Sequence, residues 1–294
     1  MIEVYEYSYI DRPRLTRTHA QLILDHAVRR IKEFTISLDL GLTKSKAYFD
    51  GNFKYVLLNN YWISIDLLKE LKGNAVYEVV DNDKIVAVTR RTPTGFYKLM
   101  AVNGDTAPTL EINGIHMHRI KDITPWEDSK LKVKAARVRR GCRVLDTCMG
   151  LGYTAILSLL RGATEVYTVE IDEVVLEISQ HNPWSRILER RGIIIIKGDI
   201  FKVIDELPNN YFHTIIHDPP RFTSTSGDLY SEEFYRKLCR VLRPRGTLFH
   251  YTGEPGKHRI RFVKGVMERL RKAGFYHVKW INGVKGVIAY KLEW

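Results

Sequence analysis

The chain has 294 residues, of which 45% are hydrophobic and 27% charged, which is enough for two domains with their own cores. No run of about 18 apolar residues predicts a membrane span, the N-terminus lacks a signal-peptide pattern, and three scattered cysteines exclude a disulfide framework or a Cys-x-x-Cys metal site. We therefore expect a soluble, cytoplasmic protein without a bound metal.

The net charge of +12 is unevenly distributed. Residues 1–124 hold 17 Lys and Arg against 15 Asp and Glu, whereas residues 125–294 hold 29 against 19. A basic surface attracts phosphate polymers and releases their counterions, so the C-terminal part is expected to bind nucleic acid. The alternative is a solvated surface typical of a thermophilic protein, because only two glutamines accompany many Lys, Arg, Glu and Ile residues.

Residues 1–124 are predicted to form a small, mainly β domain with one or two helices. Residues 1–10 alternate in polarity like an edge strand, and residues 19–34 have the apolar spacing of a helix on which His26 is packed. Period-two segments and hairpin turns follow. We expect a short helix near 64–71 and strands at 36–40, 53–58, 75–80, 84–90, 95–102 and 115–119.

A helix over residues 125–138 is predicted to join this domain to a second one, residues 125–294. Thr124 is a suitable cap, Pro125 suits the first position, and Glu127 completes a capping box. The end of this helix is rich in arginine: Arg137, Arg139, Arg140 and Arg143.

The stretch that follows the linking helix is the most informative part of the chain. An apolar strand ends in Asp146, and the chain turns through Gly150 and Gly152 into a helical run over 153–160. Glycines suit a sharp turn that brings the backbone close to a ligand. The next strand ends in Glu170, 18 residues after Gly152, where a carboxylate can accept both hydroxyls of a ribose.

Two further strands also end in acids. Strand 193–196 leads to Asp199, and strand 214–217 leads to Asp218, so four successive strands carry an acid at the edge where open α/β sheets bind ligands. The remaining expected elements are helices at 172–181, 183–190, 229–242 and 257–273 and terminal strands at 275–281 and 286–292.

This series resembles the class I S-adenosylmethionine-dependent methyltransferases over residues 125–294. The likeness includes the glycine loop 146–152, Asp218-Pro219-Pro220, and residues 242–246 before the next strand; the usual first loop glycine is replaced by Cys148. It implies an α/β, Rossmann-like domain with a seven-stranded sheet and S-adenosyl-L-methionine as cofactor. The cofactor-binding residues it implies are Asp146, Cys148, Met149, Gly150, Gly152, Tyr153, Thr154, Glu170, Ile171, Asp199, Ile200 and Asp218.

The Asp218-Pro219-Pro220 segment indicates which atom is methylated. An exocyclic base amine is a weak nucleophile, and an acid with a rigid backbone carbonyl can accept its N–H groups and aim its lone pair. Prolines fix such a loop without adding N–H donors. The segment resembles the Asp-Pro-Pro-aromatic signature of amino methyltransferases, which implies catalytic roles for Asp218, Pro219, Pro220 and Phe222.

One departure from this signature leaves the base-stacking residue open, and several other residues are candidates for contact with the substrate. Arg221 occupies the usual aromatic position, so either Arg221 or Phe222 is expected to stack on a flipped base, with core packing of Phe222 as the alternative. The segment 115–119 contributes further candidates for substrate contact, or else exposed residues of an edge strand: His116, His118 and Arg119. The pocket rim is expected to include His250, Tyr251 and Glu254.

We therefore expect a methyltransferase that acts on a base amine of RNA. The whole chain looks like a group of archaeal methyltransferases, which favours cytosine N4 of ribosomal RNA, free or in an assembling small subunit. Adenine N6 and guanine N2 remain open, whereas C5 methylation needs a cysteine that residues 149–238 lack. A polyamine aminopropyltransferase is the main alternative, although its polycationic substrate favours an acidic pocket; a non-catalytic RNA-binding assembly factor is the third.

Overall fold

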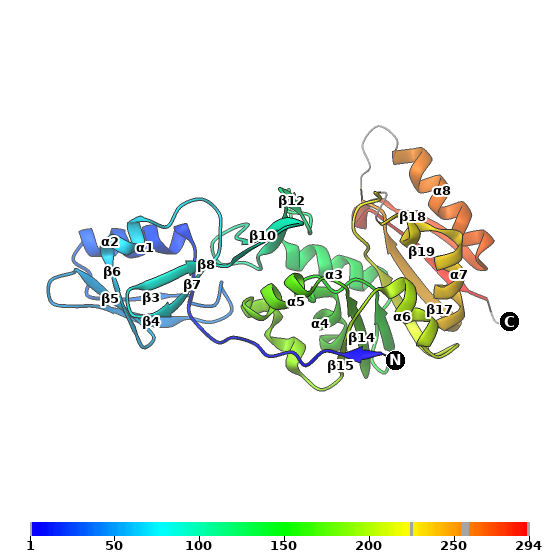
Figure 1. The fold of residues 1–294 in the computed structure, drawn as a ribbon, viewed down its shortest axis with the longest axis horizontal. Helices are drawn as coiled ribbons and strands as arrows, with labels where there is room; N and C mark the ends of the chain where they lie inside the picture. Colours follow the sequence, from blue (N-terminus) through cyan, green and yellow to red (C-terminus); the bar gives the residue numbers. More distant parts are fainter. Residues whose placement is uncertain (1, 224–225, 254–258, 293–294) are drawn as a thin grey trace. The chain divides into compact units, whose positions relative to one another are not determined.

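The computed structural model describes residues 2–223, 226–253 and 259–292. It divides into two compact units (Figure 1): unit 1 comprises Met1–Tyr7, Glu127–Val175 and Ile187–Trp294, and unit 2 comprises Ser8–Trp126 and Leu176–Arg186. These units differ from the predicted division at 124/125 in two places, because residues 1–7 lie with unit 1 and residues 176–186 with unit 2.

Unit 1 contains an eight-stranded sheet in the order β1-β15-β14-β13-β16-β17-β19-β18. The strands β13 to β17 run parallel, and β19 and β1 are antiparallel to their neighbours. The predicted α/β fold is confirmed, with one strand more than expected because Glu3 and Val4 pair with β15. The strands are β1 (Glu3–Val4), β13 (Arg143–Asp146), β14 (Glu165–Glu170), β15 (Ile193–Lys197), β16 (Phe212–His217), β17 (Leu242–Tyr251), β18 (Phe275–Ile281) and β19 (Gly286–Lys291).

The order of the strands determines which helices share a face. From β13 the chain steps outward through β14 to β15, then crosses back to β16 and β17, and right-handed crossovers in opposite directions place helices on opposite faces. Accordingly α6, α7 and α8 share one apolar core. The helices are α3 (Pro125–Ala135), α4 (Tyr153–Leu160), α5 (Glu173–Gln180), α6 (Ile200–Glu206), α7 (Glu232–Val241) and α8 (Arg259–Lys272).

Two predicted helices have a different form in the structure. The segment expected as one helix over 229–242 is a 3₁₀ helix, Gly227–Tyr230, followed by α7, because Ser231 is extended and caps the N–H of Phe234. The segment 183–190 is a 3₁₀ helix, Pro183–Glu189. None of the helices in the described part of the chain is long and apolar enough to span a bilayer.

Unit 2 is mainly β, as predicted. It has sheets in the orders β3-β4-β5-β6, β2-β7-β8 and β12-β11-β10-β9. The predicted helix 19–34 is shorter, because the left-handed Arg30 (φ 58°) follows its end and a strand begins at Glu33. The elements are β2 (Arg14–Leu15), α1 (Arg17–Val28), β3 (Glu33–Ile36), β4 (Ser45–Phe49), β5 (Tyr55–Leu58), β6 (Tyr61–Ser64), α2 (Ile65–Lys69), β7 (Tyr77–Asp81), β8 (Lys84–Ala87), β9 (Thr89–Thr92), β10 (Gly95–Met100), β11 (Thr109–Ile112) and β12 (Ile115–His116).

A buried arginine ties residues 176–186 to the rest of unit 2. Arg14 is fully buried, and its guanidinium donates to the backbone carbonyls of His181, Arg12 and Ile10 at 2.6–2.7 Å. It also pairs with Glu78 at 3.0 Å. Because each N–H of a buried guanidinium needs an acceptor, this arrangement fixes the backbone of residues 10–12 against that of His181.

Candidate active site

The parallel strands of unit 1 bring the predicted acids to one edge of the sheet. Asp146 is the last residue of β13 and is paired with Thr168 and Ile216 of the strands on either side. Glu170 ends β14, Asp199 follows β15, and Asp218 follows β16. Since all four strands are parallel neighbours, their carboxyl ends meet, and the edge forms a single acidic site.

The glycine loop between β13 and α4 has the conformation that its sequence indicates. Gly150 and Gly152 have φ angles of 56° and 76°, in the left-handed region that favours glycine. A Cβ on Gly152 would lie 2.7 Å from the methyl groups of Leu188. The loop is anchored by the N–H of Met149, which donates to the carbonyl of Val169 at 2.8 Å.

Glu170 fixes this loop through hydrogen bonds, and it lies at the end of β14, where the sequence predicts contact with a ribose. One carboxylate oxygen accepts the N–H of Gly150 at 2.9 Å, and the other accepts the N–H of Asp172 at 3.0 Å. Burial raises the pKa of Glu170, while these backbone bonds oppose the shift. Each oxygen keeps a further lone pair, so the same carboxylate can accept ribose hydroxyls.

Asp146 is completely buried and stabilises the glycine loop through side-chain hydrogen bonds. Its two oxygens accept the hydroxyls of Thr154 at 2.9 Å and Thr168 at 2.7 Å. Burial, with a smaller contribution from the nearby charges of Asp218 and Glu170, raises its pKa to about 7 against these hydrogen bonds. Asp146 therefore supports the turn, and its part in cofactor binding stays a prediction.

The other predicted cofactor residues are divided between surface and interior. Ile171 is 65% exposed beside Glu170, and Asp199 is half-buried and caps α6 through the N–H of Phe201. Burial raises the pKa of the half-buried Cys148 thiol well above its usual value. The buried members of the set, whose side chains pack inside the unit, are Met149, Tyr153, Thr154 and Ile200. Their part in cofactor binding stays a prediction.

A buried lysine that the sequence analysis missed engages Asp218. Lys132, on α3, is 1% exposed, and its Nζ lies 2.7 Å from Oδ2 of Asp218 and 3.0 Å from Oδ2 of Asp128. The same ammonium lies 4.0 Å from the ring centroid of Tyr251. The signal available in the sequence was the i, i+4 spacing of Asp128 and Lys132 beside the apolar Val133 and Ala136, which places both charges on the inward face.

The ion pair and burial oppose each other at this site. Burial raises the pKa of Asp218, and the charge of Lys132 and its hydrogen bond oppose the rise. Burial by itself would lower the pKa of Lys132, but Asp218, Asp128 and Tyr251 outweigh it, and the net shift is upward. Lys132 is therefore a firmly protonated partner that favours the carboxylate form of Asp218.

A tyrosine hydroxyl anchors the loop after Asp218. Pro219 is buried and Pro220 exposed, and the hydroxyl of Tyr230 donates to the carbonyl of Pro220 at 2.8 Å. Phe222 is 56% exposed and lies edge-on to Tyr230, with 5.4 Å between the ring centroids. Phe222 is thus not a core residue, and the neighbouring Arg221 is exposed as well.

Two histidines near this edge are neutral core residues. His217 bonds to the hydroxyl of Thr147 at 2.7 Å and the carbonyl of Leu229 at 2.9 Å, and burial lowers its pKa to about 4. His250 is fully buried 4.4 Å from the His217 ring, so its predicted place on the pocket rim is wrong. The other rim candidates are Tyr251, half-buried beside Lys132, and Glu254, which lies outside the described residues.

The remaining substrate candidates belong to unit 2. His116 ends β12 and pairs with Glu111 at 3.3 Å, and His118 bonds to the hydroxyl of Thr109 at 3.0 Å. Arg119 follows directly in the chain. These contacts lie within unit 2, and the role of the three residues toward a substrate stays a prediction.

The known proteins similar to this chain differ in how much of it they cover. No protein-family model matches the chain. An uncharacterized protein of Methanocaldococcus jannaschii is 46% identical over 266 residues, covering 88% of this chain and 90% of that protein. Ribosomal RNA large subunit methyltransferase I of Aeromonas hydrophila is 26% identical, covering 48% and 37%, and polyamine aminopropyltransferase 2 of Streptomyces coelicolor is 30% identical, covering 42% and 23%. The chain thus spans less than half of the length of these last two relatives.

Among solved structures, spermidine synthase from Thermotoga maritima aligns with a TM-score of 0.53 and 17% identity, over 70% of this chain and 72% of that one. At this identity the likeness concerns the fold. The strand order, the glycine turn and the acids along one edge define a class I methyltransferase-like protein. Within that class the chain belongs to the same family as the Methanocaldococcus jannaschii protein.

Proposed function

We propose that this protein is an S-adenosyl-L-methionine-dependent methyltransferase that acts on an exocyclic amine of an RNA base. The observation that carries the proposal is the carboxylate of Asp218, which stands at the ligand-binding edge of the sheet with one oxygen fixed by the buried Lys132. A carboxylate so fixed is a preorganised acceptor, and such groups are most effective where water is excluded.

The residues of the edge fit the proposed cofactor. The glycine turn lets the backbone approach a ligand at a place where a side chain would not fit. Glu170 offers acceptor oxygens for two ribose hydroxyls. When bound, S-adenosyl-L-methionine supplies an electrophilic methyl group on a sulfonium. The chain's own acids at this edge complement the positive charge of such a ligand.

The side chains around Asp218 suit the binding of an amine. Oδ2 accepts from Lys132, and in the described part of the chain Oδ1 has no such partner, so it can accept an N–H of the target amine. The prolines hold the loop while the amine nitrogen uses its lone pair to form the new N–C bond. The methyl–sulfur bond of the sulfonium would break at the same time, with its electron pair left on sulfur as a neutral thioether. The proton displaced from that nitrogen can pass to Asp218 and then to water.

RNA is supported as the substrate by charge and by relatives. The basic excess lies in residues 125–294, and a curated relative that overlaps this region is named as a ribosomal RNA methyltransferase. Phe222 and Arg221 are exposed beside the Asp-Pro-Pro loop, where an aromatic ring or a guanidinium can stack on a base. Cytosine N4 of ribosomal RNA is the target that the likeness to archaeal methyltransferases favours, and adenine N6 and guanine N2 are the other amines to test.

Polyamine aminopropyl transfer is the alternative that the relatives and the fold neighbour raise. The ion pair between Asp218 and Lys132 argues against it, because a carboxylate already neutralised by a buried ammonium attracts a polycation weakly. A polyamine would also have to approach the positive charge of Lys132. A titration with S-adenosyl-L-methionine and with its decarboxylated form separates the two functions.

Substitutions of Asp218 test the chemistry. Asp218→Ala should lower methyl transfer by about 10²–10³, the effect of removing one preorganised contact, while cofactor affinity stays within a few-fold. Asp218→Asn keeps an acceptor oxygen, so it retains activity if acceptance alone matters and loses it if the carboxylate must take the proton. Nucleoside mass profiles of RNA with and without the protein identify the methylated base; wild-type transfer by the alanine variant would overturn the proposed role.

A further inference from the structure

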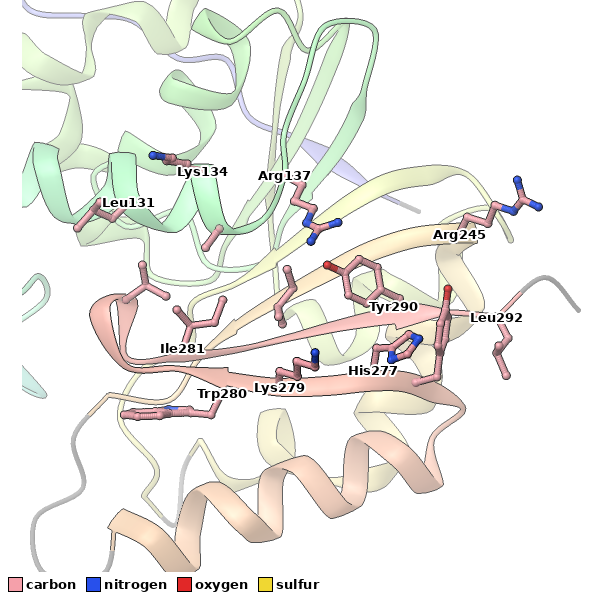
Figure 2. A pocket seen from close by; sticks show the side chains of 14 residues that line it. Leu131, Lys134, Arg137, Arg245, His277, Lys279, Trp280, Ile281, Tyr290 and Leu292 are labelled. Carbon is pink, nitrogen blue, oxygen red and sulfur yellow. The ribbon is translucent and has the colours of Figure 1, made fainter.

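Unit 1 has a long recess between α3 and the paired strands β18 and β19, with a volume of about 1130 Å³ (Figure 2). Lys279 and Tyr290 line it and alternate along the strands with Val278 and Val287, which pack in the core with α7 and α8. Tyr276 lines it too and pairs with Tyr290, so it shares this face across the register shift between Tyr276 and Lys279. The recess therefore lies on the face of the sheet opposite to α8. We refer to it as the β18–β19 groove.

The walls of this groove are basic and aromatic. Lys134 and Arg137 lie on the α3 side and Lys279 on β18, as Figure 2 shows, and the Arg137 guanidinium lies 5.0 Å from the ring centroid of Tyr290. Tyr276 is next to Tyr290, at 6.0 Å between centroids. Among the described residues that line the groove there is no aspartate or glutamate, so its charge is uncompensated within its own walls.

A smaller recess of about 410 Å³ continues the groove at the amino edge of the parallel strands. The two share Arg137, Arg245 and Tyr290, and the second adds Arg139 and Arg243. His213 lines this smaller recess, and its pKa is lowered, first by burial and then by the surrounding arginines. The effect of the arginines shows that positive charge is concentrated there. Together the two recesses form one continuous basic path.

The register of the strands gives this path a direction. Ile281, at one end of the groove, pairs with Gly286, which pairs with Tyr251. The Tyr251 ring contacts Lys132, the partner of Asp218, so this end lies at the proposed methyl-transfer edge. Tyr290 lies farther toward the amino edge, where the arginine-rich recess begins.

We propose that the β18–β19 groove binds a single-stranded segment of the RNA substrate that continues from the methylated nucleotide. This inference rests on the proposed function and adds a second binding site to it. Bases stack on Tyr290 and Tyr276, and phosphates lie along Lys134, Lys279 and Arg137. Aromatic rings interleaved with cations along a groove are what sequence-tolerant binding of single strands requires, because every base has a π face and every nucleotide a phosphate.

Two sets of variants test the groove. Lys134→Glu with Lys279→Glu cancels the net positive charge of its walls, and Lys202→Glu with Lys272→Glu makes the same change in net charge on α6 and α8, on the opposite face. Affinity for a labelled single-stranded RNA of about 12 nucleotides is measured against salt concentration. The groove variant should lose at least about 10-fold in affinity, and its slope of log affinity on log salt should fall by about 1.4, which is about 0.7 per phosphate contact. The control should keep the wild-type slope.

Stacking is tested separately with Tyr290→Leu. Loss of one stacked base should weaken RNA binding by about 5- to 100-fold without changing the salt slope. Titration with S-adenosyl-L-methionine should give the wild-type affinity in all groove variants, because the glycine turn and Glu170 are untouched.

The outcomes separate the groove from the proposed function. If wild-type protein binds RNA and methylates it while the groove variants bind equally well, the groove inference is overturned and the function stands; the groove would then be a surface for a protein or none. If wild-type protein fails to bind RNA even at low salt, both proposals fail. A salt slope reduced equally by the control variant would show general attraction rather than a built groove.

Discussion

Removing the ammonium of Lys132 should expose how much the site depends on its buried ion pair. Lys132 is 1% exposed and neutralises two carboxylates at 2.7 and 3.0 Å, so Lys132→Met leaves the buried Asp128 and the partly buried Asp218 without this cation. Loss of one partner from a buried pair costs about 3–5 kcal/mol of stability. Burial already raises the pKa of Asp218, and without Lys132 nothing of comparable strength opposes it.

The sign of the pH effect follows from this balance. Transfer needs the carboxylate of Asp218, so activity rises with pH through the pKa of that group, and the whole curve should move to higher pH in Lys132→Met. At neutral pH the rate should fall by up to about 10²–10³. The assay is the initial rate of methyl transfer to RNA against pH, with stability measured by denaturant unfolding on the same samples.

Two further variants separate the loss of stability from the change in the pH profile. Lys132→Met combined with Asp128→Asn also removes the charge of the buried Asp128 and should recover part of the lost stability while the pH profile stays shifted. Lys130→Met is the matched control, because Lys130 lies on the same helix but is exposed. A folded Lys132→Met protein with the wild-type pH profile would refute the reasoning.

Three further predictions concern the loop and the core. Glu170→Ala should weaken binding of S-adenosyl-L-methionine by about 2–3 kcal/mol in calorimetry, and an unchanged affinity would remove Glu170 from the site. Gly152→Ala should lower thermal stability by about 1–2 kcal/mol because of its φ of 76° and the contact with Leu188, whereas Gly51→Ala, which meets open space, should not. His217 has a pKa lowered from 6.5 to about 4, so stability present above pH 6.5 should fall by about 3 kcal/mol as the pH drops through 4, and His217→Asn should flatten this dependence in denaturant titrations.

The sequence by itself determined the plan of the carboxyl edge of the sheet in unit 1. Glycines with left-handed backbone, the acids that end four strands, and the helix between them are local features, because turn geometry and strand periodicity depend on neighbouring residues. For this reason the residue pattern alone was enough to place Gly150, Gly152 and Glu170. The mainly β character of unit 2 could be predicted for the same reason. Its first helix, however, ends before the left-handed Arg30, earlier than the apolar spacing predicted.

Only the tertiary structure decided which of these polar groups face the site and which support it. Asp146 ends its strand like Glu170, yet Thr154 and Thr168 enclose it, and His250 lies in the core rather than on a rim. Lys132 reaches Asp218 across 86 positions of sequence. Such contacts depend on how α3 and the strands pack against one another. No local sequence pattern predicts that two charges far apart in the chain will form an ion pair.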